Sequence, residues 1–244
     1  RGLTRGCLGY SMRVRREMGN LAHVVRLTAD SLGMGRNALH HDQNGSDDMF
    51  VDLASESDAV VISEADLRGY EEVVDFLATA NPVAHDRTLR VHRLVVAHRR
   101  MHLRAGSWET ELAAAVSGVG LATVPATLLV RHLQGQPLHI EEYVLIDDVP
   151  RQRDRVVRRL PNGETLLPVL HDADRRFDEG AEPSFSGSLI RIASAIDTGE
   201  RRGLEWAELS EWLHEDPGSL DPALLETVLL TSYRARARHE VLQL

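Results

Sequence analysis

The stretch that decides the expected N-terminal fold is Thr28-Ala-Asp-Ser-Leu-Gly-Met-Gly-Arg-Asn-Ala-Leu-His40. Its spacing fits two short helices that meet at a tight turn. Ala29 is small where the helices would cross, and Gly33 suits the positive-φ position that ends the first helix. Leu39 would anchor the second helix to the core. The stretch therefore predicts a helix-turn-helix.

The second helix of this pair would carry three polar side chains on its outer face, namely Arg36, Asn37 and His40. A helix that reads the major groove of DNA keeps such side chains outward, where they contact base edges. A helix that ends in Leu-Gly also occurs at ordinary helical corners, because short motifs match by chance. Two interpretations therefore stay open, a DNA-reading helix and a structural corner.

A further helix is predicted over residues 9–24 by apolar residues at helical spacing. Three arginines lie largely off its apolar face, and we expect them near DNA phosphates: Arg13, Arg15 and Arg16. Residues 1–41 carry a net charge of +5, whereas the chain from residue 42 onward carries −14. A basic head on an acidic body is typical of a small DNA-binding module attached to another domain.

The basic residues and the single cysteine exclude several classes of protein. All 28 basic side chains are arginine, so a lysine Schiff base and the lysine of a phosphate-binding loop are both excluded. Cys7 stands alone, which excludes an internal disulfide framework and a multi-cysteine metal site. The sequence has no signal-peptide pattern and no apolar run of about 18 residues. We therefore expect a cytoplasmic protein that makes no membrane contact.

The pattern along the chain predicts an α+β fold with four parts. These are a helix-turn-helix head over residues 1–62, a linker helix over 63–84, an antiparallel α+β ligand domain over 85–200 and C-terminal helices over 201–244. Apolar alternation predicts the strands of a central antiparallel sheet with flanking helices. The predicted strands cover residues 89–96, 121–129, 138–146 and 184–195, and the middle two would form a hairpin.

Capping residues and apolar spacing predict the helices of the same region. They cover residues 64–78, 107–116 and 151–160, and two more follow residue 202. Asn81-Pro82 would interrupt the helical pattern. Asp221-Pro222 would open the last helix, because proline suits the first helical position.

Four short runs in the middle of the chain carry a resemblance to a known fold. They are Gly106-Ser107 with Thr110, Leu128-Leu-Val-Arg-His-Leu-Gln-Gly-Gln-Pro-Leu-His-Ile-Glu-Glu142, Gly163-Glu-Thr-Leu-Leu167 and Arg175-Arg-Phe-Asp-Glu179. Over residues 95–195 the chain resembles the chorismate-lyase fold and its non-catalytic relative, the UTRA effector domain of GntR/HutC-type regulators. The resemblance implies that Arg131, Glu179 and Ser107 bind a ligand. A guanidinium such as that of Arg131 suits a carboxylate, which it binds through two parallel hydrogen bonds.

The N-terminal stretch resembles the same family. Leu32-Gly-Met-Gly-Arg36 is similar to the Leu-Gly-Val-Ser-Arg core of its reading helix, although Gly35 lacks the N-cap oxygen of the serine. The resemblance implies a DNA-binding transcriptional regulator that responds to a small anionic ligand. We expect a homodimer held by the last two helices, because paired half-sites in duplex DNA need paired heads.

Other interpretations remain open. Arg131 and Glu179 could serve a chorismate-lyase-like enzyme that acts on a carboxylated substrate, with the acid protonating a leaving group. The chain could instead be a scaffold with no chemistry of its own. Residues 19–35 are also similar to a helix of flavin-dependent nitroreductases. We expect neither a cofactor nor a metal ion, because the histidine–aspartate runs at 40–42 and 171–172 can arise by chance among 12 histidines.

Overall fold

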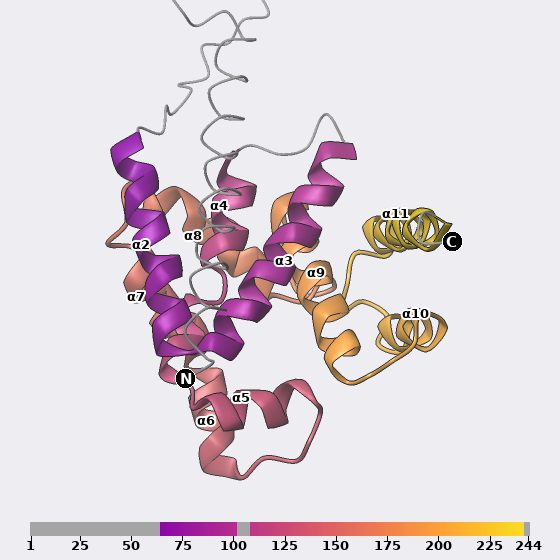
Figure 1. The fold of residues 1–244 in the computed structure, drawn as a ribbon, viewed down its shortest axis with the longest axis horizontal. Helices are drawn as coiled ribbons and strands as arrows, with labels where there is room; N and C mark the ends of the chain where they lie inside the picture. The colour runs from indigo at the N-terminus through magenta and orange to yellow at the C-terminus, as the bar shows by residue number, and fades with distance from the viewer. Residues whose placement is uncertain (1–63, 102–107, 242–244) are drawn as a thin grey trace, which may run out of the picture. The chain divides into compact units, whose positions relative to one another are not determined.

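The computed structural model describes the backbone of residues 64–101 and 108–241, and the side chains of 67–98 and 108–233. The chain divides into two units, Arg1–Arg68 and Gly69–Leu244, and we call the second the C-terminal unit. Every regular element in the described ranges is a helix (Figure 1). This part of the chain is therefore all-α.

The helices follow one another through mostly short connections. In chain order they are α2 (Glu64–Ala80), α3 (Pro82–Met101), α4 (Trp108–Val116), the 3-10 helix η1 (Val119–Thr123), α5 (Ala126–Leu133), α6 (Ile140–Asp147), α7 (Val149–Val157), α8 (Gly163–Asp174), α9 (Phe185–Arg201), α10 (Trp206–His214) and α11 (Pro222–Val241).

The predicted α+β class is wrong for the described residues, because they contain no part of the antiparallel sheet expected over 85–200. The segment 89–96 lies within α3, and 184–195 lies almost entirely within α9. The expected hairpin of 121–129 and 138–146 consists instead of η1 and α5 followed by α6. The effector-domain resemblance thus implied a sheet where the chain forms helices.

Helix α3 has a helical pattern of burial that its polar residues hide in the sequence. Its buried positions include Ala84, Thr88, Val91, Val95 and His98, at alternating intervals of four and three residues. This spacing places all five on one face of the helix. Within 89–96 the polar His92 is also buried, so the apolar residues of that segment alone do not show the helical period.

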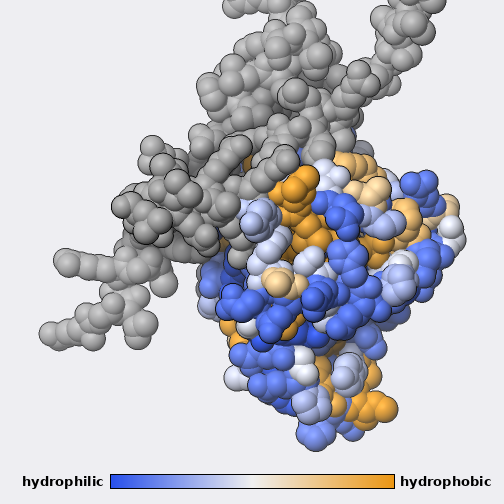
Figure 2. Space-filling model, turned by 90° about the vertical axis from the view of Figure 1, so that its right-hand side faces the viewer, coloured by the Kyte–Doolittle hydropathy of each residue, from blue (hydrophilic) through white to orange (hydrophobic). Residues whose placement is uncertain are grey.

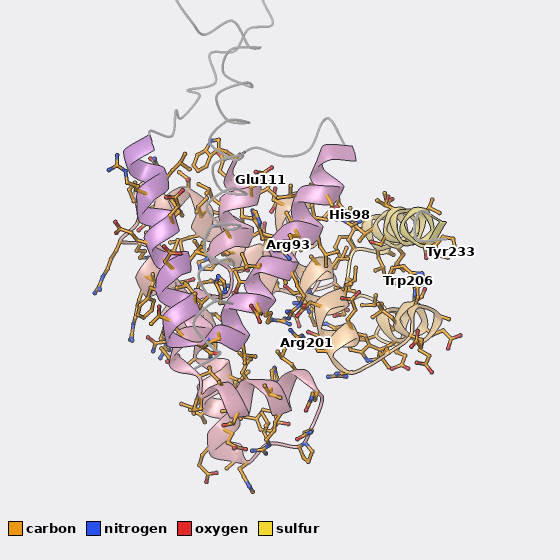
Figure 3. All side chains as sticks on the ribbon, viewed as in Figure 1. Arg93, His98, Glu111, Arg201, Trp206 and Tyr233 are labelled. Atoms are coloured by element: carbon orange, nitrogen blue, oxygen red, sulfur yellow. The ribbon has the colours of Figure 1, made fainter. Side chains whose placement is uncertain are left out.

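His98 also joins α3 to α11 (Figure 3). Its Nδ1 lies 2.7 Å from the carbonyl oxygen of Leu94, one turn earlier on α3. Its Nε2 lies 3.2 Å from the carbonyl oxygen of Val228 and 3.2 Å from Oγ of Ser232, both on α11. The buried ring is therefore hydrogen-bonded on both sides, as buried polar groups require.

Helix α9 is the central helix of the C-terminal unit, and it packs against α3, α4, α8, α10 and α11. Leu189, Ile190, Ile192 and Ile196 are all at most 2% exposed. Leu189, Ile190, Ile192 and Ala193 form a short apolar run interrupted only by Arg191. Such a run cannot be told from a buried strand by its periodicity alone, which explains the wrong prediction for 184–195.

Asn81 fixes the turn between α2 and α3. Its side chain is buried, and its Oδ1 accepts a hydrogen bond of 3.2 Å from the N–H of Ala84 in the first turn of α3. Its Nδ2 donates to the carbonyl oxygens of Leu121 and Val124, at 3.0 and 2.8 Å. The turn is thus tied to η1, beside an apolar cluster made of Leu77, Ala84, Val124, Leu128, Leu129 and Leu133.

The structure confirms several predicted helices. Those expected at 64–78, 107–116 and 151–160 correspond to α2, α4 and α7 within a few residues, and both C-terminal helices are present. Helix α11 begins at Pro222 as expected. The carboxylate of Asp221 accepts hydrogen bonds of 3.0 Å from the N–H groups of Ala223 and Leu224, so it caps the helix.

Helix α6 has no buried residue although its sequence is largely apolar. Ile140 is 77% exposed and Val144 is 62% exposed. Figure 2 shows hydrophobic surface at the lower end of the domain, where α5 and α6 lie in Figure 1. The expected hairpin failed here because most apolar residues of α6 face solvent, although Ile146 packs against the apolar cluster.

No single helix within the described ranges is long and apolar enough to cross a membrane. Trp108–Thr123 and Ala126–Leu133 reach that length and composition only when taken together, and the two segments are bent by 119° to each other.

Candidate anion-binding cavity

A cavity of about 600 Å³ opens inside the C-terminal unit, between α3, α5, α7, α8, α9 and α10. Its volume lies in the range of sites that hold small molecules. Part of the wall is apolar and includes Leu129, Leu133 and Leu220. The charged part of the wall decides which molecules the cavity can bind.

Cationic side chains outnumber acidic ones in this wall. The basic residues are Arg87, Arg153, Arg191, Arg202 and His132, and the acidic ones are Asp174, Glu215 and Asp216. Hydroxyl groups come from Thr88, Ser117, Ser194, Thr198 and Ser219. The partners that each basic group already has determine whether it can still bind a ligand.

A fully buried carboxylate, Asp197, holds two arginines at one side of the cavity. Its Oδ2 accepts a hydrogen bond of 2.8 Å from Nη1 of Arg87, and its Oδ1 accepts one from Nε of Arg90. Asp197 is 0% exposed, so these guanidiniums replace the water that the carboxylate has lost. Two guanidiniums and one carboxylate leave a net positive charge, and Arg87 presents it to the cavity.

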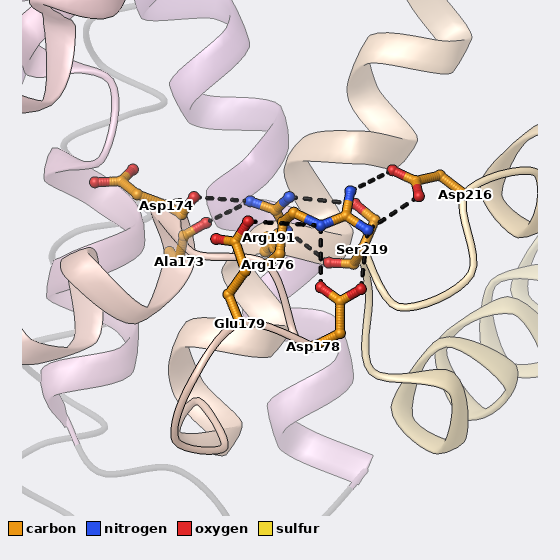
Figure 4. A network of polar contacts seen from close by, with 8 residues as sticks. All are labelled: Ala173, Asp174, Arg176, Asp178, Glu179, Arg191, Asp216 and Ser219. Atoms are coloured by element: carbon orange, nitrogen blue, oxygen red, sulfur yellow. Dashed lines mark hydrogen bonds and ion pairs between the residues drawn. The ribbon is translucent and has the colours of Figure 1, made fainter.

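Arg153 and Arg191 are occupied by the fold itself. Arg153 is buried and donates to both oxygens of Asp174, at 2.9 and 2.8 Å. Arg191 donates to the carbonyl oxygens of Ser219 and Asp174, at 2.9 and 3.0 Å (Figure 4). Both guanidiniums therefore have little capacity left for a ligand.

Arg176 joins the loop before α9 to the loop after α10 (Figure 4). Its guanidinium donates to both oxygens of Asp178 and to both oxygens of Asp216. These hydrogen bonds lower the pKa of both carboxyls. The network holds the loop that carries Asp216 and Ser219, two residues of the cavity wall.

The side chain of Arg202, directly after the end of α9, is positioned by packing contacts of its guanidinium and not by hydrogen bonds. Its guanidinium carbon lies 4.9 Å from the ring centroid of Trp212, a cation–π contact. A Cβ at Gly135, where φ is +69°, would lie 3.2 Å from both Cζ and Nε of Arg202. Within the described part of the chain, no carboxylate or other acceptor binds this guanidinium. Its N–H groups are thus available to a ligand.

His132 on α5 is close to Arg87 and Arg202, and we call these three residues the cationic corner. Burial lowers the pKa of His132, the two guanidiniums lower it further, and Asp147 opposes them. Neither ring nitrogen has a hydrogen-bond partner among the residues that the structure describes. An anion placed between the three groups would offset the repulsion and make the imidazole easier to protonate.

The structure does not bring Arg131 and Glu179 together. Arg131 donates to Oε1 and Oε2 of Glu142, at 2.8 and 3.2 Å, and to the carbonyl oxygen of Pro137. Glu179 is 62% exposed, and its Oε1 lies 3.9 Å from Nε of Arg176. The pair therefore does not form the shared carboxylate site that the resemblance implies.

The other predicted site residues lie outside the described residues. They are the expected ligand contact Ser107 and the expected DNA contacts Arg13, Arg15, Arg16, Arg36, Asn37 and His40. Their roles remain predictions.

Sequence reasoning named Arg131 on α5, whereas the structure places its neighbour His132 in the cavity wall. Consecutive residues on a helix point about 100° apart, because one turn holds 3.6 residues. Arg131 turns to Glu142, whereas the next residue, His132, faces the cavity. The position of Arg202 just after the end of a helix was a weak available signal, because cations are favoured there. Nothing in the sequence indicated its stacking on Trp212.

The described residues contain no group of three His, Cys, Asp or Glu side chains that could hold a metal ion. No protein-family model matches the chain, and no curated protein matches it in sequence.

Proposed function

We propose that the C-terminal unit binds a small anionic ligand in its cavity, and that the ligand controls DNA binding by the N-terminal segment. The observation that carries the ligand part is the cationic corner. Arg202 and His132 face a cavity of suitable size, and their polar atoms have no partner in the described residues. Guanidiniums with free N–H groups are strong binders of carboxylates and phosphates.

Arg87 adds to the positive potential of the corner without depending on a ligand for its place. Its hydrogen bonds to Asp197 and to Oγ1 of Thr198, at 2.8 and 3.1 Å, hold the guanidinium in position. A site in which the cations are already ordered loses little conformational entropy when a ligand binds. The fold itself occupies the polar atoms of Arg153 and Arg191, whereas Arg202 stacks on Trp212 and keeps its N–H groups free of acceptors within the described residues.

The DNA part of the proposal rests on the sequence. Residues 1–41 carry a net charge of +5 and include the helix-turn-helix pattern with Arg36, Asn37 and His40. A ligand that binds one arrangement of two heads better than another would shift the DNA-binding population. A homodimer through α10 and α11 would supply the second head.

Isothermal titration of the full chain with sulfate, phosphate, citrate and benzoate tests the ligand part. We expect at least one anion to bind the wild type and to lose about tenfold or more in affinity in Arg202→Gln, since a hydrogen bond to a charged group contributes about 1.5–3 kcal/mol. Arg159→Gln is the matched control, because Arg159 is exposed and does not line the cavity. Equal binding by both variants, or no binding by the wild type, would overturn the ligand part.

Binding of the full chain to a random pool of duplex DNA tests the DNA part. Wild-type binding should weaken steeply as salt rises, because counterions are released on association. Arg36→Ala should lose sequence selection, and the anion that fills the cavity should change the affinity for DNA. Absence of DNA binding at low salt would overturn this part and leave the ligand part standing.

A further inference from the structure

We infer that the ligand of the cavity carries a tetrahedral dianion, a phosphoryl or sulfuryl group, and that its binding transfers a proton from solvent to His132. This inference rests on the proposed function, because it assigns the chemistry of the same cationic corner. It names both the class of ligand and the residue that selects it.

The geometry of the corner favours three-sided contact. Arg87 comes from α3, His132 from α5, and Arg202 from the end of α9, so three separate elements present one cation each. Oγ1 of Thr198 receives a hydrogen bond of 3.1 Å from Nη1 of Arg87. A planar carboxylate offers its oxygens in one plane, whereas a tetrahedral group can accept hydrogen bonds from three directions at once.

The charge of the corner fits a dianion better than a monoanion. The Arg87–Arg90–Asp197 trio keeps one net positive charge and Arg202 supplies a second, while the carboxylate of Asp147 opposes them at His132. With a proton on His132 the corner holds a third. A monoanion would leave the two guanidiniums partly uncompensated and would give the imidazole little reason to gain a proton.

The groups around His132 explain why the proton arrives with the ligand. Arg87 and Arg202 face it from α3 and from the end of α9, and both disfavour a protonated ring. Asp147, the last residue of α6, is the acidic group that acts on it and favours the proton. Burial is the first cause of the lowered pKa of His132 and the two guanidiniums come next; a dianion bound against the guanidiniums offsets their effect, so the pKa of His132 rises in the complex.

The size of the cavity identifies the rest of the ligand as organic. A bare tetrahedral ion fills a small part of about 600 Å³, and the wall includes the apolar side chains of Leu129, Leu133 and Leu220. Inorganic phosphate and an organic phosphomonoester share the same head group. The affinities for phenyl phosphate and for inorganic phosphate at pH 8 distinguish an organic phosphomonoester from the free ion. Tighter binding of phenyl phosphate identifies an organic ligand.

Titration with sulfate tests the proton transfer, because sulfate keeps both charges between pH 6 and 8. We expect the affinity of the wild type to fall by up to about tenfold per pH unit as the pH rises over this range. Titrations in two buffers of different ionisation enthalpy should show uptake of up to one proton. Benzoate, a monoanion, should bind at least about tenfold more weakly and take up no proton.

His132→Gln should bind sulfate more weakly than the wild type at pH 6, and its sulfate affinity should not depend on pH. The control His139→Gln should behave as the wild type, because His139 is exposed and lies outside the cavity. Because His132→Gln could disturb the fold, the wild-type imidazole is also followed by NMR with labelled histidine. Its pKa should rise when sulfate is added.

Sulfate binding without proton uptake, or benzoate binding as tight as sulfate, would overturn this inference and leave the proposed function intact. The same slope with pH in wild type and His132→Gln would do so too. Failure of every anion to bind would overturn the proposed function itself.

Discussion

Asp197→Asn is expected to destabilise the C-terminal unit strongly, although the substitution barely changes the size of the side chain. Asp197 is 0% exposed and accepts hydrogen bonds from Arg87 and Arg90. The asparagine oxygen can replace one of these acceptors, but its amide group then faces the N–H groups of the other guanidinium. The variant leaves two neighbouring cations without the carboxylate between them.

The magnitude follows from the burial of the three groups. Removal of one partner from a buried ion pair typically costs about 3–5 kcal/mol. The side chains of Arg87 and Arg90 are 16% and 28% exposed, so water partly solvates their charges, and we expect the low end, about 3 kcal/mol. In a domain of this size each 1 kcal/mol shifts Tm by about 2–4 °C, which gives a fall of about 6–12 °C.

Thermal unfolding followed by circular dichroism measures this effect, with Asp216→Asn as the matched control. Asp216 also pairs with an arginine, but it is 62% exposed, and solvent screens exposed pairs, so its loss should shift Tm much less. Equal shifts of Tm in the two variants would refute the reasoning, because burial would then not decide the strength of these contacts.

Two further predictions concern packing and pH. Ile192→Ala should lower the free energy of unfolding by about 2–5 kcal/mol in urea titrations, because Ile192 is 0% exposed. Ile140→Ala should change it by about 0.5 kcal/mol or less, because Ile140 is 77% exposed. Equal losses would contradict the placement of α6. Burial lowers the pKa of His85 from its usual 6.5. Below pH 6.5 the unfolded chain therefore binds more protons at this residue than the folded chain does. The free energy of unfolding should consequently fall as the pH drops from 6.5. His85→Gln should flatten that part of the stability–pH curve, and an unchanged slope would speak against a neutral His85 in the fold.

The sequence allowed the positions of many helices to be predicted but not the class of the fold. Local signals sufficed where a cap or a proline marks an end, as Asp221 and Pro222 do for α11. They failed on α3 because the polar His92 belongs to the buried side of the segment 89–96. They failed on α9 because Leu189, Ile190, Ile192 and Ala193 form a short apolar run, which periodicity alone cannot distinguish from a buried strand.

The candidate site was even less accessible from sequence, because it is assembled from distant parts of the chain. An anion site was expected, and an arginine on α5 was proposed as its anchor. The structure places the adjacent His132 at the cavity and directs Arg131 to Glu142. The role of Arg202 becomes visible only when its contacts with Trp212 and Gly135 are known. Such contacts depend on tertiary packing, which no short motif encodes.

The most direct test of the cavity as an anion site is a crystal structure of the full chain with selenate, a tetrahedral dianion whose selenium scatters anomalously. We predict an anomalous peak in the cavity, with selenate oxygens within about 3 Å of the guanidinium of Arg202 and of the ring of His132. A cavity without a peak, or selenium bound only to arginines on the outer surface, would contradict the account.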